Sequence, residues 1–138
     1  MLLDSNIIIY SVQPEYQIIL EFLSSKEDNI SISIVSKIEV LGYHDLSEFV
    51  KENLQLFFSE IPIINLSDEI AEIAIQLRQK KKMTLGDSII AATAIHKNIP
   101  LLTNNIKDFK HIENLELIAL DDVINMDNNE FPGLGVSA

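Results

Sequence analysis

Residues 84–95 read TLGDSIIAATAI, a mostly apolar stretch that contains one carboxylate, Asp87. Almost every residue after Asp87 is apolar or small, so the stretch predicts a helix that is buried on most sides. Asp87 then lies near the first turn, on a face of small side chains that also carries Ala91 and Ala94. Two interpretations are open. Either Thr84 caps the helix and Asp87 completes a capping box at the positive end of the helix dipole, or Asp87 points into an acidic pocket shared with other segments.

Further polar residues stand where predicted strands end and where predicted helices begin. The first strand ends at Asp4, and the fourth ends at Thr103, just before Asn105. Glu39 lies just inside a helix, as Asp87 does. In a parallel sheet the carboxyl ends of the strands and the starts of the following helices lie at one edge. The sequence therefore predicts that these segments converge there.

Strand-like and helix-like segments alternate along the chain. Strands are predicted at residues 1–4, 30–35, 61–66, 100–103 and 115–120. Helices are predicted at residues 7–12, 14–23, 36–43 (capped by Ser36), 46–58, 68–82 (capped by Ser67) and 84–97, with a short helical piece around Phe109. Such alternation is typical of an α/β fold, here three-layer α/β/α with a central, mostly parallel five-stranded sheet. We expect one domain over residues 1–120 and a loosely ordered tail over residues 121–138.

Composition narrows the class of protein. The 138 residues are 47% hydrophobic, which suits one domain with a proper core. No apolar run approaches the roughly 18 residues that a membrane span needs. The chain has no cysteine, so disulfides and thiolate chemistry are excluded, and we expect a cytoplasmic protein without membrane contact. The net charge of −11 argues against a protein that coats nucleic acid, but not against a nuclease with a local cationic patch and a divalent metal.

Asp4, Glu39 and Asp87 would form a site of hard oxygen ligands. They have no nearby cysteine or histidine ligand, which disfavours zinc and favours Mg²⁺ or Mn²⁺. Without a cation, carboxylates this close would repel one another and take up protons through raised pKa values. Such a site suits hydrolysis of phosphodiester bonds by an activated water. The histidines, His111 among them, lack the spacing of a triad or a metal site, and we expect them at the surface or at a rim.

As a set, these residues resemble the PIN-domain family, and within it the small VapC-like toxins of toxin–antitoxin modules. The resemblance extends over residues 1 to about 120. It implies an RNase-H-like arrangement of acids that holds one or two divalent ions. Asp4, Glu39 and Asp87 match the first three family acids, and Asn105 falls at the fourth position.

The chain departs from the family pattern next to these acids. Ser5 stands where threonine is usual and keeps the hydroxyl, and Gly86 stands where proline is frequent. Asn105 is an amide, so any fourth ligand is neutral and a second metal ion would be held less well. The resemblance implies that Thr103 orients a water or a ligand. Asp108 either supplies the missing charge or has only a capping or surface role.

Residues 78–82 carry the densest positive charge of the chain, in Arg78, Lys80, Lys81 and Lys82. Cations at the end of a helix complement its dipole and are usually solvated. The same residues, just before Asp87, could instead hold RNA phosphates beside the site. Both interpretations are kept.

The resemblance implies a divalent-metal-dependent endoribonuclease, the toxin of a toxin–antitoxin module. Its partners would be RNA, an antitoxin protein that lays an extended or helical segment over the active-site groove, and a second copy in a homodimer. The alternative is a catalytically weak PIN-fold module that binds RNA or protein, which Asn105 and the acidity favour. A phosphoacceptor receiver domain is excluded, since Ser5-Asn6 and Asn65-Leu66 stand where that class needs acids.

Overall fold

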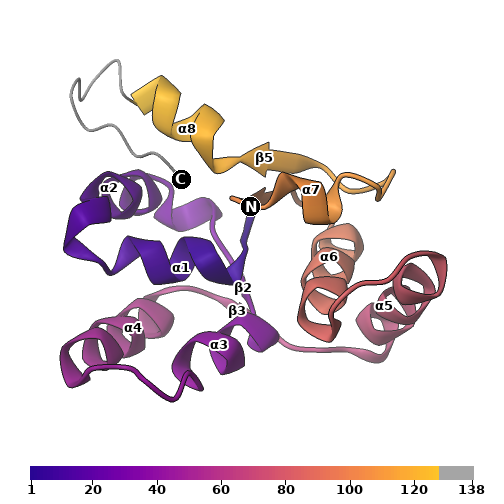
Figure 1. The fold of residues 1–138 in the computed structure, drawn as a ribbon, viewed down its shortest axis with the longest axis horizontal. Helices are drawn as coiled ribbons and strands as arrows, with labels where there is room; N and C mark the ends of the chain where they lie inside the picture. Colours follow the sequence, from indigo (N-terminus) through magenta and orange to yellow (C-terminus); the bar gives the residue numbers. More distant parts are fainter. Residues whose placement is uncertain (128–138) are drawn as a thin grey trace.

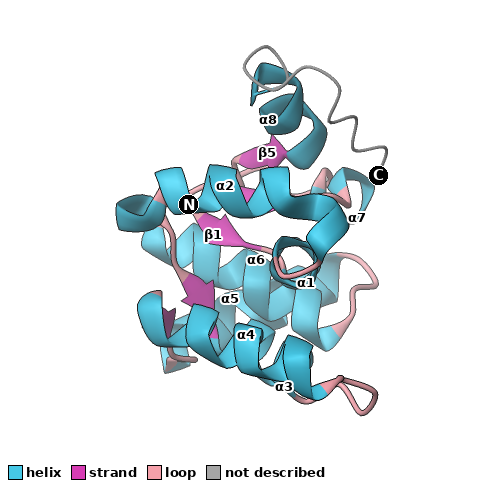
Figure 2. Ribbon diagram, turned by 90° about the vertical axis from the view of Figure 1, so that its left-hand side faces the viewer, coloured by secondary structure: helices cyan, strands magenta, loops and turns pink. Residues whose placement is uncertain are grey.

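The computed structural model describes residues 1–127. Its helices and strands, in chain order, are β1 (Leu2–Leu3), α1 (Ser5–Ser11), α2 (Gln17–Ser25), β2 (Ile32–Ser33), α3 (Ile34–Leu41), α4 (Glu48–Glu60), β3 (Ile63–Ile64), α5 (Asp68–Lys80), α6 (Leu85–Lys97), β4 (Leu101–Thr103), α7 (Ile106–Phe109), β5 (Leu117–Ala119) and α8 (Leu120–Asp127). Short 3₁₀ turns at Pro14–Tyr16 and Glu27–Asn29 flank α2. Short strands lie among helices that make up most of the molecule (Figure 2). Within this described part, no helix is long and apolar enough to cross a membrane.

The paired strands run parallel, as predicted. β1, β4 and β5 form one sheet in the order β1-β4-β5, and β2 pairs with β3 in a second. A single parallel bridge between Leu2 and Ser31 links the two sheets. The expected continuous sheet of five strands is thus divided into sheets of three and two. The strands are only two or three residues long, and the bridge from β1 reaches Ser31, just before β2, and not β2 itself.

Neighbouring residues of β1 face opposite layers of helices. Leu3 is buried with apolar residues of α1, α2, α4 and α8, whereas Leu2 is buried with residues of α6 and α7. This alternation follows from the two-residue period of a strand. Figure 1 shows α1, α2 and α4 on one side of the central strands and α5 and α6 on the other. The predicted layering of helices around parallel strands is confirmed.

The helix predicted at residues 84–97 is α6. Its buried residues run without a break from Ser88 to Ala94. Thr84 is the N-cap, and its hydroxyl accepts a hydrogen bond from the Asp87 backbone N–H at 3.1 Å. The helix ends at Asn98, whose φ of 55° is left-handed, a conformation that asparagine tolerates better than most residues. Both the buried helix and its predicted cap are confirmed.

The start of α3 differs from the prediction. Ser33, not Ser36, is the N-cap, and its hydroxyl accepts from the Val35 backbone N–H at 3.1 Å. The helix therefore begins within the segment predicted as a strand. The alternating pattern of residues 30–34 persists into the first turn of α3, so periodicity alone places the boundary too late. As a consequence Ser36 lies buried inside the helix, where it takes part in the site.

The tail expected from Asp121 onward begins instead with α8, so the prediction of a loose tail is wrong for residues 121–127. Leu120, Val123 and Ile124 are buried, at the spacing of one helix face. They join the same core cluster as Leu3. Residues 128–138, the rest of that predicted tail, lie outside the described residues.

Candidate active site

Asp4 lies at the junction between β1 and α1 and is only 5% exposed. Its Oδ1 accepts a hydrogen bond from the Ser5 backbone N–H at 2.8 Å, which makes Asp4 the N-cap of α1. Its Oδ2 accepts from the Thr103 hydroxyl at 2.7 Å. Thr103 is itself fully buried at the end of β4, and its hydroxyl oxygen accepts from the Asn105 backbone N–H at 2.9 Å. Asp4 is thus fixed through both oxygens by the two segments that flank it.

Glu39 lies on α3, and hydroxyl contacts of Ser5 and Ser36 link it to the start of α1. The Ser5 hydroxyl lies 2.9 Å from Glu39 Oε1 and 3.0 Å from Ser36 Oγ. Because a hydroxyl has one proton to donate, the arrangement that satisfies both contacts has Ser5 donating to the carboxylate and accepting from Ser36. Ser36 was expected only as a helix cap and was missed as a site residue.

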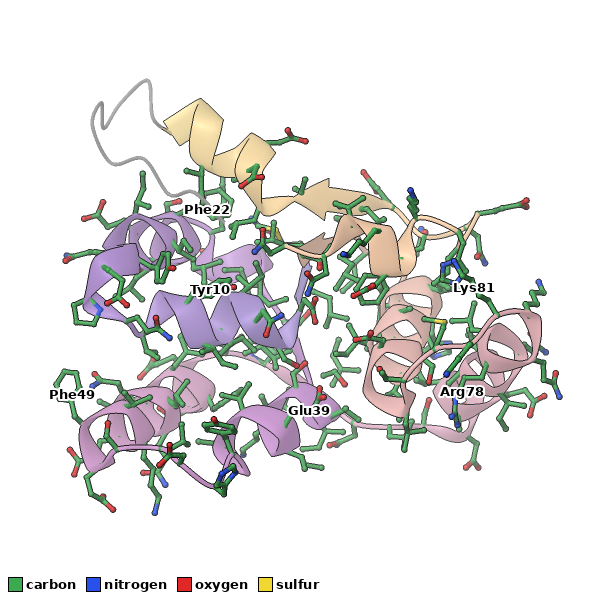
Figure 3. The ribbon with its side chains drawn as sticks, viewed as in Figure 1. Tyr10, Phe22, Glu39, Phe49, Arg78 and Lys81 are labelled. Carbon is green, nitrogen blue, oxygen red and sulfur yellow. The ribbon has the colours of Figure 1, made fainter. Side chains whose placement is uncertain are left out.

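Gly86 brings α6 against the Glu39 carboxylate. A Cβ at Gly86 would lie 2.8 Å from Glu39 Oε2, closer than real Cβ contacts come. The absence of a side chain at this position therefore lets the carboxylate sit beside the first turn of α6. Asp87 is the next residue, so Glu39 and Asp87 share this corner of the molecule. Figure 3 shows Glu39 in the central region between the two groups of helices.

Four carboxylates act on one another in this region. Burial raises the pKa of Asp4, hydrogen bonds from Thr103 and Ser5 oppose the rise, and the charges of Glu39 and Asp108 add to it. Burial likewise raises the pKa of Asp87, and the charge of Asp4 adds to the rise. A hydrogen bond with Thr84 opposes it, and the charges of Asp108 and Glu39 raise the pKa further. A bound cation would reduce the repulsion between these partly buried negative charges.

The donor set fits a hard divalent ion. The site offers carboxylate and hydroxyl oxygens, which suit Mg²⁺ or Mn²⁺. Among the residues that the structure describes, no three acidic or histidine side chains are close enough together to hold a metal ion in their present positions. Glu39 is exposed and accepts its hydrogen bond from Ser5, so its side chain would have to move for the three acids to bind one ion.

Some of the other predicted site residues lie beside the three acids, and others lie away from them. Asp108 lines a cavity of about 410 Å³ together with Asp87, so it lies beside the acids. Asn105 contacts Thr103 through its backbone N–H, and its side chain makes no helix-capping hydrogen bond to α7. Of the basic run, Lys81 and Lys82 line the same cavity as Asp87, whereas Arg78 lines an apolar cavity between α5 and α6.

Two basic residues of this cavity were missed as candidates for the site. Lys107 lies two residues after Asn105, and His111 lies at the end of the turn that follows α7. The position of Lys107 just after a predicted strand end was a usable signal. His111 had none, because its place depends on how the segment after α7 packs against the loop between α5 and α6.

Known proteins are similar to this chain in sequence and in fold. A sequence model of the PIN domain matches residues 1–115. Ribonuclease VapC2 of Rickettsia felis is 35% identical over 127 residues, which cover 84% of this chain and 94% of that protein. The fold is similar to that of VapBC2 from Rickettsia felis bound to a DNA fragment from its promoter, with a TM-score of 0.76, 29% identity, and coverage of 87% of this chain and 98% of that one. A toxin–antitoxin complex from Klebsiella pneumoniae gives a TM-score of 0.63 and 32% identity, over 85% of this chain and 94% of that one.

Proposed function

We propose that this chain, which belongs to the PIN-domain family and within it to the VapC ribonuclease toxins, cleaves RNA with a divalent metal ion bound by Asp4, Glu39 and Asp87. Family membership gives the class of enzyme, a ribonuclease of a toxin–antitoxin system. The roles of the individual residues and the identity of the ion are our proposal. RNA as the substrate also leads us to place the activity in the cytoplasm.

A bound Mg²⁺ or Mn²⁺ would supply an activated water and would offset the negative charge that builds up on the scissile phosphate. The chain's own residues orient the ligands. Thr103 and the Ser5 backbone N–H each occupy one lone pair of Asp4, so the remaining lone pairs present a defined direction. Ser5 holds Glu39, and Thr84 fixes the turn from which Asp87 projects.

The observation that carries this proposal is that the fold brings three acids together: Asp4 is buried and held through both oxygens, Ser5 next to it bonds Glu39, and Glu39 lies against Gly86, beside Asp87. A capping role for Asp87 alone would not explain why other carboxylates lie close to it. The experiment is cleavage of single-stranded RNA with Mg²⁺, with Mn²⁺ and with a chelator. Asp87→Asn should abolish the metal-dependent cleavage and keep the fold, as measured by circular dichroism. Asp68→Asn, in the first turn of the serine-capped α5, is the matched control and should cleave normally.

The second candidate is a catalytically weak PIN-fold module that acts by binding. Asn105 favours it, because an amide at the fourth acidic position removes one charge from the ligand set. The same assay decides between the two: RNA binding without cleavage in either metal would favour the binding module.

The resemblance implies an antitoxin segment over the active-site groove. The exposed apolar residues lead us to propose that the antitoxin also binds a groove between α2 and α4, which contains none of the site acids. It has a volume of about 510 Å³, and its apolar lining includes the exposed side chains of Leu20, Phe49 and Leu56. In Figure 3, Phe49 lies at the outer edge of α4, away from Glu39. A partner segment with apolar residues on one side and positive charge on the other fits this groove, given the net charge of −11. Leu56→Asp should weaken capture of the antitoxin and leave RNA cleavage intact.

For the predicted homodimer we propose the face formed by α5 and the start of α6. Leu66, Ile75 and Leu85 are exposed there, around the apolar cavity that Arg78 also lines. A two-fold contact would bury the same patch on both copies. This face adjoins Gly86 and Asp87, so two active sites would lie near the dimer interface.

A further inference from the structure

A second, basic region begins beside the acids. The cavity of about 410 Å³ that Asp87 and Asp108 line, called here the near cavity, also exposes Lys81, Lys82 and Lys107. Three lysines on a chain with only ten cations are a marked local excess of positive charge, since the chain as a whole carries −11. The excess lies next to the residues proposed to cleave a phosphodiester. It is therefore placed to hold substrate phosphates rather than to neutralise the helix end alone.

The basic region continues into another cavity. This far cavity, of about 550 Å³, is lined by Leu77, Lys80, Lys81, His111, Ile112, Glu113 and Asn114. Lys81 and His111 line both cavities, so the two adjoin at these side chains. Arg78 belongs to neither and lies on the α5–α6 face. Figure 3 shows Lys81 nearer than Arg78 to the segment that precedes β5.

His111 is the least satisfied polar side chain at this junction. Both of its ring nitrogens are shielded from solvent and have no hydrogen-bond partner among the described residues. Burial, and after it the charge of Lys81, lowers the pKa of His111, which favours the neutral imidazole. A neutral ring offers one donor, one acceptor and an aromatic face. A nucleobase in either cavity would offer hydrogen-bond partners to these nitrogens and a surface for stacking to the ring, as in single-strand recognition by histidine.

We propose that the near and far cavities form a track for single-stranded RNA, in which Lys81 binds the backbone phosphate and His111 the base of the nucleotides on one side of the scissile bond. The proposal rests on the proposed ribonuclease function. Each cavity lies within the range of about 300–1,000 Å³ of small-ligand pockets, so each has room for about one nucleotide. Lys82 and Lys107 flank the first step of the track, and Lys80 and Asn114 flank the second.

The test is a series of RNA oligonucleotides that grow by one nucleotide at either end from a cleavable dinucleotide, with Mg²⁺ or Mn²⁺ and the full chain. In the unmodified protein kcat/KM should rise for the first two nucleotides added at one end and not at the other. Lys81→Gln and His111→Ala should each remove most of this gain. For His111→Ala the loss should be roughly 5- to 100-fold for the nucleotide concerned, which is the range for loss of a side chain that stacks on a base. His111→Phe should restore the part of the gain that comes from stacking. Lys97→Gln removes the same charge from an exposed residue at the end of α6, outside both cavities, and should behave like the unmodified protein.

Three results would overturn the track, and they differ in what they say of the enzyme. Cleavage of the dinucleotide without a gain at either end, or an equal loss of the gain in Lys97→Gln, would refute the track and leave the ribonuclease site standing. No metal-dependent cleavage of any member of the series would refute the site and the track together. Lys81 is exposed, so Lys81→Gln keeps the test valid even where changes at the partly buried His111 affect folding.

Discussion

The hydroxyl of Thr103 donates a 2.7 Å hydrogen bond to Oδ2 of Asp4, and this contact joins residues 99 positions apart in the chain. It forms where β1 and β4 lie side by side and end at the same edge. Both residues are buried, so the contact is shielded from water and fixes the Asp4 carboxylate in one orientation. The neighbouring strand thus decides which way the proposed metal ligand faces.

Thr103→Val should therefore lower both stability and activity. The variant keeps the shape of the side chain but leaves a buried carboxylate oxygen without its donor, at a cost of about 1–3 kcal/mol in the free energy of unfolding. Metal affinity should fall as well, because Asp4 is then held through Oδ1 alone. Thr103→Ser keeps the hydroxyl and should recover most of the activity. Urea unfolding and RNA cleavage measure the two effects, and a fully active Thr103→Val would show that Thr103 does not position Asp4.

Asp87→Asn separates the two interpretations of the α6 acid through the pH dependence of stability without metal. The folded state raises the pKa of Asp87, so the charged carboxylate destabilises the fold at neutral pH and this penalty disappears as pH falls through the raised pKa. The variant should then be more stable than the unmodified protein at pH 7, and the difference should shrink toward pH 4. A pure capping role predicts the opposite at pH 7, a loss of about 1 kcal/mol or less. Thermal unfolding with a chelator at several pH values decides, and added Mn²⁺ should stabilise only the unmodified protein.

Gly86→Ala should reduce metal binding without weakening the fold. Its Cβ would lie 2.8 Å from Oε2 and 3.1 Å from Cδ of Glu39, so the flexible Glu39 side chain must move away. Alanine is preferred over glycine within a helix by up to about 1 kcal/mol, which offsets the cost of that movement. Calorimetry with Mn²⁺ should show lower affinity for Gly86→Ala at unchanged or higher melting temperature. In a Glu39→Gln background the same substitution should have little further effect on affinity, since the ligand is already lost.

The sequence predicted those parts of the site that depend on the order of strands and helices. Asp4, Thr103 and Asp87 lie at strand ends or in a first helical turn, and parallel topology brings such positions to one edge. Residues whose place depends on packing between segments were not predictable in this way. Ser36 became a hydrogen-bond partner of Ser5 only because α3 begins at Ile34, earlier than the alternating pattern indicates.

Two other parts of the molecule also depend on packing that the sequence pattern does not describe. Lys107 and His111 reach the near cavity through the packing of α7 and its following turn, which no periodicity describes. α8 forms because Leu120, Val123 and Ile124 meet the core, although the polar residues between them suggested a loose tail. The roles of the individual acids remain predictions that the substitutions above test.

The exposed apolar residues on the α5–α6 face predict that the protein forms a homodimer. Leu85 is 60% exposed, and Ile75 and Leu66 on the same face are about half exposed, an arrangement that favours burial against a second copy. Leu85→Lys should convert a dimer to a monomer, because a two-fold contact would place the new charge twice in one apolar interface. Leu56→Lys introduces the same charge at a residue that is 66% exposed in the groove between α2 and α4, so it should remain dimeric. Sedimentation equilibrium without RNA or antitoxin measures both. A monomeric unmodified protein, or equal dissociation by the two substitutions, would mean that the α5–α6 face serves another contact.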